Sequence, residues 1–255
     1  MKQSIQDIAN TLDHAAQHAS SVEQISKTTA LDLKGAYEVQ ALSLKNRYQR
    51  GEKLAGYKLG FTSRAKMEQM GVHNLIWGRL TDKMQIENGG TLLRENYIHP
   101  RVEPEIAFKI GRRIDTALRL NEVVGYIDAV AGALEIIDSR YENFKFSLED
   151  VIADNCSSTA YVIGDWQAAD TPVQDVHLHM NINGEQSQTG NSNAILGNPL
   201  ESLVEISRIL AEYGEAIEPG AVVLAGAATS AVYINAGDQI EGVFDGLGKV
   251  KLTVQ

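Results

Sequence analysis

The sequence predicts an α+β fold, with a largely β core and helices around it. Up to about residue 50 the apolar side chains recur at helical spacing, whereas glycine-rich turns divide the later chain into short strand-like runs. These strands cluster instead of alternating with helices, and no glycine-rich phosphate loop follows a strand, so a doubly wound α/β sheet is less well supported. We expect a helical region over 1–50 and a β domain over 51–255, joined as one continuous unit.

Two helices are predicted in the N-terminal region. Ile5, Ile8 and Leu12 follow helical spacing. Asp32 is a residue type that caps helices, and we expect a second helix to begin after it. The apolar stripe of that helix comprises Leu33, Ala36, Tyr37 and Leu44.

The middle of the chain is predicted to mix strands with short helices. We expect a strand over 56–61, a strand that carries Glu103 and Glu105, a helix over 122–131, and then a strand that carries Glu135. Ser147 and Asp150 resemble a capping box, which predicts a helix through Ile152.

The last sixty residues are predicted to form one helix followed by strands. Pro199 suits the first turn of a helix, and Gly214 is a good terminator. The expected strands that follow lie at 221–225, 231–235, 239–244 and 249–254. The glycine-rich run 245–248 predicts a hairpin turn between the last two.

Composition excludes several classes of function. A formal charge of −10 without a basic stripe argues against nucleic-acid binding, and no apolar run is long enough to predict a membrane span. The N-terminus does not resemble a signal peptide. Cys156 is the one cysteine, so no internal disulfide can form and a reducing compartment, the cytoplasm, is expected.

The most informative motif is the pair Glu103 and Glu105. On a strand, side chains two apart project from the same face, and here the opposite face is apolar. Like charges repel, and a shared divalent cation such as Mg²⁺ removes the conflict. The alternative is the charged solvent face of an edge strand, but Pro104 and the later Glu135, a lone carboxylate in an apolar run, favour a metal site with Glu135 as third ligand.

Lys58 is the leading cation for chemistry beside such a metal. It lies in an otherwise apolar strand between two glycines, where burial disfavours its charge. One interpretation is a lysine on an edge strand that extends its ammonium to water. The other is a group that steers an anionic substrate or carries a proton.

Two polar segments are candidates for the substrate pocket. The run 154–159, which includes Ser157 and Ser158, is typical of a cap and turn but is also suited to lining a polar pocket. The run 226–229 follows an apolar strand, and its N–H groups and the Thr229 hydroxyl suit a carboxylate. Cys156 lacks a His/Asn partnership that would indicate a nucleophile.

Together these motifs resemble the fumarylacetoacetate-hydrolase-like superfamily, in its branch of 2-hydroxypentadienoate hydratases and 4-oxalocrotonate decarboxylases. The resemblance extends from about residue 25 to 254. The sequence departs from the family pattern at Asn198, where many relatives have His, and at Cys156, where Ala is frequent. The matching stretches are 56–63, 70–72, 99–106, 134–140, 153–155, 196–200 and 237–238.

The resemblance implies a mixed β-roll or barrel core and a Mg²⁺ or Mn²⁺ site formed by Glu103, Glu105 and Glu135. It also implies small 2-oxo or 2-hydroxy dienoic acid substrates and a homo-oligomer. Decarboxylases and hydratases of this branch associate, so the resemblance also suggests a complex with a partner hydratase. Within the branch, the runs 62–70 and 138–146 are similar to the decarboxylases. Ile76 stands where hydratases tend to carry an aspartate, and isoleucine cannot move a proton.

We therefore expect decarboxylation of 2-oxo-3-hexenedioate in the meta-cleavage catabolism of aromatic compounds, with hydration of 2-hydroxypenta-2,4-dienoate as the alternative. Hydrolysis of an acylpyruvate and a noncatalytic scaffold are less favoured. In the expected mechanism the metal binds the keto oxygen, Lys58 steers substrate or delivers a proton, and Ile76 belongs to an apolar wall. Arg140 either balances substrate charge or pairs with Asp138 or Asp154.

Overall fold

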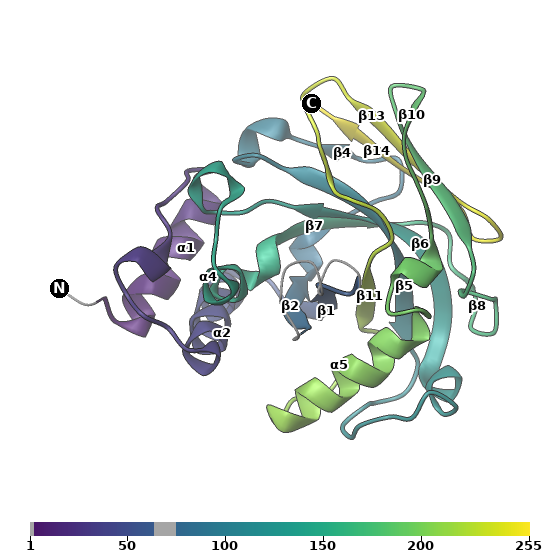
Figure 1. Ribbon diagram of the computed structural model, residues 1–255, viewed down its shortest axis with the longest axis horizontal. Helices are drawn as coiled ribbons and strands as arrows, with labels where there is room; N and C mark the ends of the chain where they lie inside the picture. The colour runs from purple at the N-terminus through teal and green to yellow at the C-terminus, as the bar shows by residue number, and fades with distance from the viewer. Residues whose placement is uncertain (1–2, 64–74) are drawn as a thin grey trace.

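The computed structural model describes residues 3–63 and 75–255 (Figure 1). Part of the run 62–70 and all of 70–72, which contribute to the resemblance, lie outside those residues. No helix within the described ranges is both long and apolar enough to cross a membrane.

The two predicted N-terminal helices are confirmed. α1 (Ile5–Gln17) begins at a capping box in which Ser4 and Asp7 each accept a backbone N–H from the other. α2 (Leu33–Gln49) begins at Asp32, whose side chain accepts the Gly35 N–H at 2.7 Å. The two helices pack together, and α2 also packs against α4 (Leu148–Ala153), at the end of the molecule that holds the N-terminus (Figure 1).

The described chain contains a nine-stranded mixed sheet, which curls as a half-barrel. Its main order is β2-β1-β11-β5-β6-β7-β3, with β12 beside β5 and β8 beside β6. The β1–β11 and β3–β7 pairs are parallel, and the other pairs are antiparallel. Its strands are β1 (Leu54–Gly60), β2 (Ile76–Thr81), β3 (Gln85–Ile86), β5 (Arg101–Ile110), β6 (Ile127–Ile137), β7 (Ser158–Ile163), β8 (Gln167–Ala168), β11 (Val222–Ala227) and β12 (Val232–Tyr233).

A second sheet of five strands packs against the first. Its order is β10-β9-β13-β14-β4, and β13 and β14 form the hairpin predicted at 245–248. The strands are β4 (Thr91–Leu92), β9 (His177–Ile182), β10 (Glu185–Asn191), β13 (Gln239–Phe244) and β14 (Gly248–Val254). Short 3-10 helices connect the elements: η1 (Ile25–Lys27), η2 (Asp82–Met84), η3 (Arg94–Asn96), η4 (Val123–Tyr126), η5 (Glu142–Phe144), η6 (Asn155–Ser157) and η7 (Ser192–Ala194).

The predicted helices at 148–152 and after Pro199 are confirmed. Ser147 and Asp150 form the predicted capping box of α4. α5 (Leu200–Glu212) begins at Pro199 and covers β11, where the Ser202 hydroxyl donates to the Ala225 carbonyl at 2.7 Å. The predicted boundary between regions 1–50 and 51–255 stays a prediction.

The helix predicted over 122–131 is wrong. Only the single turn η4 forms there, and strand β6 begins at Ile127. Alanines at 129, 131 and 133 favour a helix by propensity, but β6 pairs with β5 on one side and with β7 on the other. The hydrogen bonds and packing of a central strand outweigh that local preference.

The curled sheet has two differently packed faces. The outer face, which includes Phe108 and Leu134, joins a large core with Phe244 of the second sheet and Leu203 of α5. The inner, concave face carries a smaller core, and the pairing register places Lys58, Glu103 and Glu105 on that same face. The smaller core comprises Leu80, Met84, Ala107, Ala131, Ala133, Tyr161, Ile163, Val222 and Leu224.

The contact between the two sheets depends on Gly132. A Cβ at this position would lie 2.5 Å from Cδ2 of the buried Phe244 ring. Gly132→Ala is therefore expected to lower the free energy of unfolding by about 1–3 kcal/mol, because the ring cannot move within a packed core. Urea unfolding measures this as a lower midpoint.

Gly125→Ala is the matched control, because a Cβ there would have no neighbour within 4 Å. We expect it to change the free energy of unfolding by less than about 0.5 kcal/mol. Equal midpoints for Gly132→Ala and Gly125→Ala would show that the sheets do not meet through Gly132.

Candidate metal centre and active site

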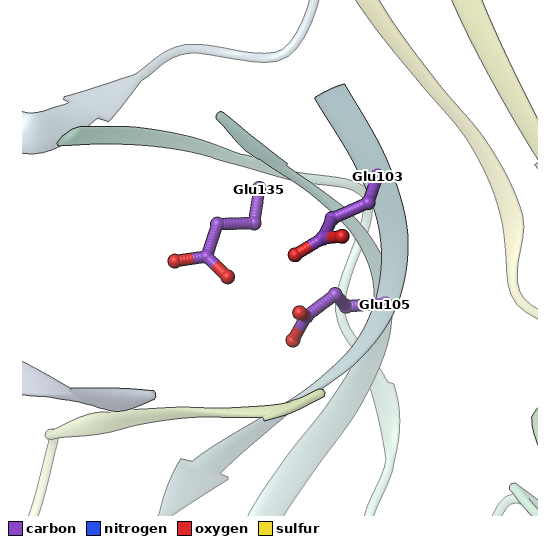
Figure 2. A group of neighbouring side chains, drawn as sticks. All are labelled: Glu103, Glu105 and Glu135. Atoms are coloured by element: carbon purple, nitrogen blue, oxygen red, sulfur yellow. The ribbon is translucent and has the colours of Figure 1, made fainter. Parts of the chain in front are cut away.

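Three glutamates converge on the concave face of the curled sheet. Glu103 on β5 stands directly opposite Glu135 on β6, and Glu105 follows two residues along β5. One carboxylate oxygen from each can be chosen so that all lie within 4.8 Å of one another. Figure 2 shows the three side chains pointing from the two strands into the inside of the bend.

The position of β5 rules out the edge-strand interpretation of the glutamate pair. β5 lies between β11 and β6, and Glu105 is fully buried, as is Glu135. Like charges directly opposite one another on a sheet are destabilising, and burial increases the cost. Burial, followed by the charges of Glu135 and Glu103, raises the pKa of Glu105 well above its ordinary value.

The unused oxygen atoms of this cluster fit a divalent cation. Oε2 of Glu105 accepts the Gly226 N–H at 2.7 Å, but Oε1 of Glu105 and Oε1 of Glu135 have no hydrogen-bond partner in the described chain. Buried carboxylate oxygens without partners are costly, and carboxylates are the preferred protein ligands of Mg²⁺ and Mn²⁺. The donor set therefore suits either ion.

The run 226–229 supports this cluster through its first residue. Gly226 adopts φ +114°, and a Cβ there would collide with the Thr62 side chain at 2.1 Å. Only glycine allows the close approach that aims its N–H at Glu105. The run was predicted to offer its N–H groups to a carboxylate, and the carboxylate that accepts the Gly226 N–H is Glu105 of the protein itself.

Lys58 lies in the same cluster, so the edge-lysine interpretation is wrong. β1 lies between β2 and β11, and the side chain is 4% exposed. Its Nζ lies 3.0 Å from Oε2 of Glu135 and 3.5 Å from the Cys156 carbonyl. Burial alone would lower the pKa of Lys58, but Glu135, Glu105 and Glu103 together raise it above its ordinary value, so the ammonium stays charged.

A cavity of about 330 Å³ opens beside this cluster, and Lys58 and Glu103 form part of its wall. Ile76 and Ser157, both predicted to contact substrate, also line it. The apolar part of the wall comprises Leu59, Phe61, Ile76, Ile137, Phe144, Phe146, Val151, Ala227 and Ala231. A cavity with convergent polar groups in an apolar wall is typical of a small-molecule site.

A second cavity, of about 450 Å³, lies between α2 and α5. It shares only Ile76 with the first and contains none of the three glutamates. We place the chemistry in the smaller cavity, because that one has Lys58 and a glutamate of the metal cluster in its wall.

Two other predicted substrate contacts lie away from that wall. Ser158 and Thr229 are buried, and neither lines the cavity. The Thr229 hydroxyl donates to the Ser230 carbonyl at 3.2 Å, whereas the Ser158 hydroxyl has no partner in the described chain. Their contact with substrate stays a prediction.

Arg140 is buried and paired with Asp154, which is one of the interpretations that the sequence left open. Its Nε and backbone N–H both donate to the Asp154 carboxylate, and its side chain also reaches the Asp154 carbonyl. Arg140 does not line the 330 Å³ cavity. Asp138 instead accepts the backbone N–H groups of Ile98 and His99. A catalytic role for Arg140 stays a prediction.

The turn that follows Asp154 has an unusual backbone. Asn155, Cys156 and Ser157 adopt φ +50°, +53° and +58°, the left-handed region that costs a non-glycine residue roughly 1–2 kcal/mol. The Asn155 side chain accepts the Arg79 N–H at 2.8 Å and donates to the Arg79 carbonyl at 2.9 Å. Those bonds hold a turn that brings Ser157 to the cavity and the Cys156 carbonyl to Lys58.

The Cys156 thiol is not activated. Burial raises its pKa to about 12, and its Sγ donates to the Trp77 carbonyl at 3.1 Å. The thiol therefore stays protonated at neutral pH.

Sequence reasoning missed Arg101 and Phe144, which both line the cavity. The signal for Arg101 was available, because it precedes Glu103 by two residues and so shares its face of β5. No local signal marks Phe144, which reaches the cavity through a left-handed backbone at φ +56°.

Comparisons with known proteins agree with this geometry. The family described as Fumarylacetoacetate (FAA) hydrolase C-terminal matches residues 65–255. The chain is 45% identical to a 4-oxalocrotonate decarboxylase from a Pseudomonas species, covering 98% of this chain and 97% of that one. It is 31% identical to a 2-keto-4-pentenoate hydratase from Paraburkholderia xenovorans (strain LB400), covering 96% and 93%.

Among solved structures, it is similar to 4-oxalocrotonate decarboxylase from Pseudomonas putida G7 complexed with magnesium and adipate. The TM-score is 0.95 at 33% sequence identity, and both chains are covered completely. The predicted fold of α+β type with a β-roll core is thereby confirmed. The chain belongs to the fumarylacetoacetate hydrolase family.

Proposed function

We propose that this protein catalyses the metal-dependent decarboxylation of 2-oxo-3-hexenedioate (4-oxalocrotonate) to 2-hydroxypenta-2,4-dienoate, a step in the meta-cleavage catabolism of aromatic compounds. The observation that carries the proposal is the trio of the half-buried Glu103 and the fully buried Glu105 and Glu135, beside a cavity with an ammonium in its wall. Likeness to decarboxylases along nearly the whole chain supports the same reaction.

The three glutamates would hold Mg²⁺ or Mn²⁺, which when bound supplies a Lewis acid for the 2-oxo acid end of the substrate. The reaction breaks the bond between C5 and C6. Its electron pair moves through the double bond toward the oxygen on C2, CO₂ leaves, and one proton is taken up to give the enol.

Lys58 is suited to stabilise the charge that develops and to supply that proton. Its ammonium lines the cavity, and the three carboxylates close to it raise its pKa. A protonated amine can act as a cation or as a proton donor but not as a base. A divalent cation held by the glutamates would lower the pKa of Lys58 and so make transfer of the lysine proton easier.

The apolar wall favours the loss of CO₂. Ile76, Phe61 and Val151 supply hydrocarbon and aromatic surface that excludes water. A dry environment disfavours a carboxylate more than it disfavours neutral CO₂. Ile76 also gives the wall no group that could move a proton during water addition, which argues for decarboxylation over hydration.

Arg140 would act through the Asp154 turn and not by contact with substrate. Assembly into homo-oligomers and association with a partner hydratase stay predictions from the resemblance, and a cytoplasmic location stays a prediction from the single cysteine. The small dicarboxylate expected as substrate agrees with the adipate in the related decarboxylase structure.

An assay with Mg²⁺ and each of two substrates tests the reaction. We expect CO₂ from 2-oxo-3-hexenedioate and little turnover of 2-hydroxypenta-2,4-dienoate. Formation of 4-hydroxy-2-oxopentanoate from the dienoate as the faster reaction would instead establish the hydratase alternative.

Glu105→Gln is expected to weaken Mg²⁺ binding and to lower kcat/KM by roughly a thousandfold or more, the equivalent of several kcal/mol of charge stabilisation. The fold should remain intact, because the change removes one of several buried like charges. Calorimetric Mg²⁺ titration and thermal unfolding of the metal-free protein measure the two effects. The exposed Glu185→Gln is the control. Wild-type activity of Glu105→Gln after chelator treatment would disprove the ligand assignment.

Lys58→Met is expected to lower kcat by about 10²-fold or more, since it removes the cation and proton donor at similar side-chain length. Mg²⁺ should bind as tightly as before or more tightly, because the ammonium near Glu135 repels the ion. Steady-state kinetics at saturating Mg²⁺ gives kcat, and calorimetry gives the affinity. An unchanged kcat would confine Lys58 to a structural role.

A further inference from the structure

Arg101 is a cation in the cavity wall to which the proposed mechanism gives no role. It begins strand β5 two residues before Glu103, and the pairing register places it on the same, concave face as the glutamates. Its guanidinium carbon lies 4.0 Å from the centre of the Phe144 ring and 4.2 Å from that of Tyr233. Its Nη2 donates to the Tyr233 hydroxyl at 2.5 Å.

Among the described residues, the guanidinium of Arg101 has no anionic partner. Within the described ranges no carboxylate lies within 4.0 Å of it, and its buried Nε has no hydrogen-bond partner. The buried arginines Arg79 and Arg140 are both paired, with Glu215 and Asp154 respectively. A guanidinium is always charged and offers five donors, so a carboxylate from outside the chain would complete the arrangement at Arg101.

The rings that hold Arg101 are themselves fixed by the fold. Asn143 and Phe144 adopt φ +59° and +56°, which is uncommon for a bulky residue and persists only where the surroundings impose it. Tyr233 on β12 is the direct cross-strand neighbour of Arg101. Ring contacts occupy the flat faces of the guanidinium, so its N–H edge is the part that remains for an anion.

The spacing along β5 suits a short dicarboxylic acid. Arg101 and Glu103 are two residues apart, which is roughly 6.5–7 Å on a strand and comparable to an extended six-carbon chain. A substrate with its 2-oxo acid end at the glutamates therefore has its other end within reach of Arg101.

We propose that Arg101 binds the carboxylate remote from the 2-oxo group and thereby makes the site selective for dicarboxylic over monocarboxylic 2-oxo acids. This inference rests on the proposed function, because it takes the glutamate trio as the position of the 2-oxo acid end. Arg–carboxylate pairs combine charge with two directed hydrogen bonds, so loss of the pair affects recognition strongly.

Arg101 acts in binding and not in bond cleavage. The carboxylate that it holds is the one lost as CO₂, so the ion pair exists in the bound substrate and weakens as the reaction proceeds. An interaction made in the ground state lowers KM without raising kcat. Removing it should therefore raise KM for 2-oxo-3-hexenedioate and leave kcat unchanged or higher.

Calorimetric titration with two stable ligands tests the selectivity. 2-Oxoadipate and 2-oxohexanoate have the same chain length and the same 2-oxo acid end, and differ only in the remote carboxylate. With saturating Mg²⁺ the wild-type protein should bind 2-oxoadipate about 10- to 100-fold more tightly. Arg101→Gln should abolish that difference by weakening 2-oxoadipate alone, and Arg101→Lys should retain part of it.

Arg112→Gln is the matched control. Arg112 also stacks on an aromatic ring, 5.0 Å from the centre of Tyr126, and it does not line the cavity. We expect it to leave both affinities and the KM unchanged. Unchanged Mg²⁺ affinity of Arg101→Gln, together with an unchanged unfolding midpoint, shows that the site is intact. If that variant does not fold, Tyr233→Phe, which removes only the hydroxyl bond to the guanidinium, should reduce the preference severalfold.

The outcomes separate the two proposals. If the Arg101 variants and Tyr233→Phe keep the full preference for 2-oxoadipate, or if the wild-type protein binds both acids equally, the role of Arg101 is disproved while the 2-oxo acid site stands. If the wild-type protein binds neither acid in the presence of Mg²⁺, the proposed function itself fails. A fall in kcat that matches the rise in KM would also overturn the inference, because it would place Arg101 in the chemical step.

Discussion

Repulsion among three carboxylates in the interior of a sheet is the constraint on which this structure depends. Glu103, Glu105 and Glu135 bring three carboxylates together, and Lys58 pairs with one of them, Glu135. Buried like charges are costly without a counter-charge. A divalent cation supplies a counter-charge that all three carboxylates can share.

The fold around this cluster is built to keep the charges together. β5 and β6 lie inside the sheet, so neither strand can move its glutamate into water without breaking its pairing with the next strand. Gly226 allows the chain to approach Glu105 closely enough for its N–H to donate a hydrogen bond to the carboxylate. The turns η5 and η6 contain left-handed residues, and Phe144, Cys156 and Ser157 among them line the cavity. Strain at such places is typical of sites that need fixed geometry.

The parts of the fold that local chemistry determines could be predicted from the sequence. Period-two spacing placed Glu103 and Glu105 on one face, and Asp32, Ser147 and Pro199 marked the starts of helices that form. The helix predicted over 122–131 was wrong because an alanine-rich segment became a central strand through its neighbours.

The cavity wall was predicted only in part, for a different reason. Ile76 and Ser157 were found, but the surroundings of Arg101 are formed by Phe144 and by Tyr233, which follows it by 132 residues. The partner of Arg140 was likewise one of several that the sequence allowed, and the fold selected Asp154. Contacts between distant segments, and left-handed backbone at ordinary residues, leave no periodic signal in the chain.

The site has two parts with different roles, the glutamate cluster and the cavity wall. This difference explains how related enzymes come to catalyse different reactions. The glutamate cluster suits any 2-oxo acid, because a cation held there can bind the 2-oxo acid group whatever the rest of the substrate is. What happens to the rest of the substrate depends on the wall. Isoleucine at position 76 cannot activate water, and the aromatic rings around Arg101 leave it one edge with which to hold an anion. A wall of this composition retains a dicarboxylate and keeps water from it, which favours loss of CO₂ over addition of water.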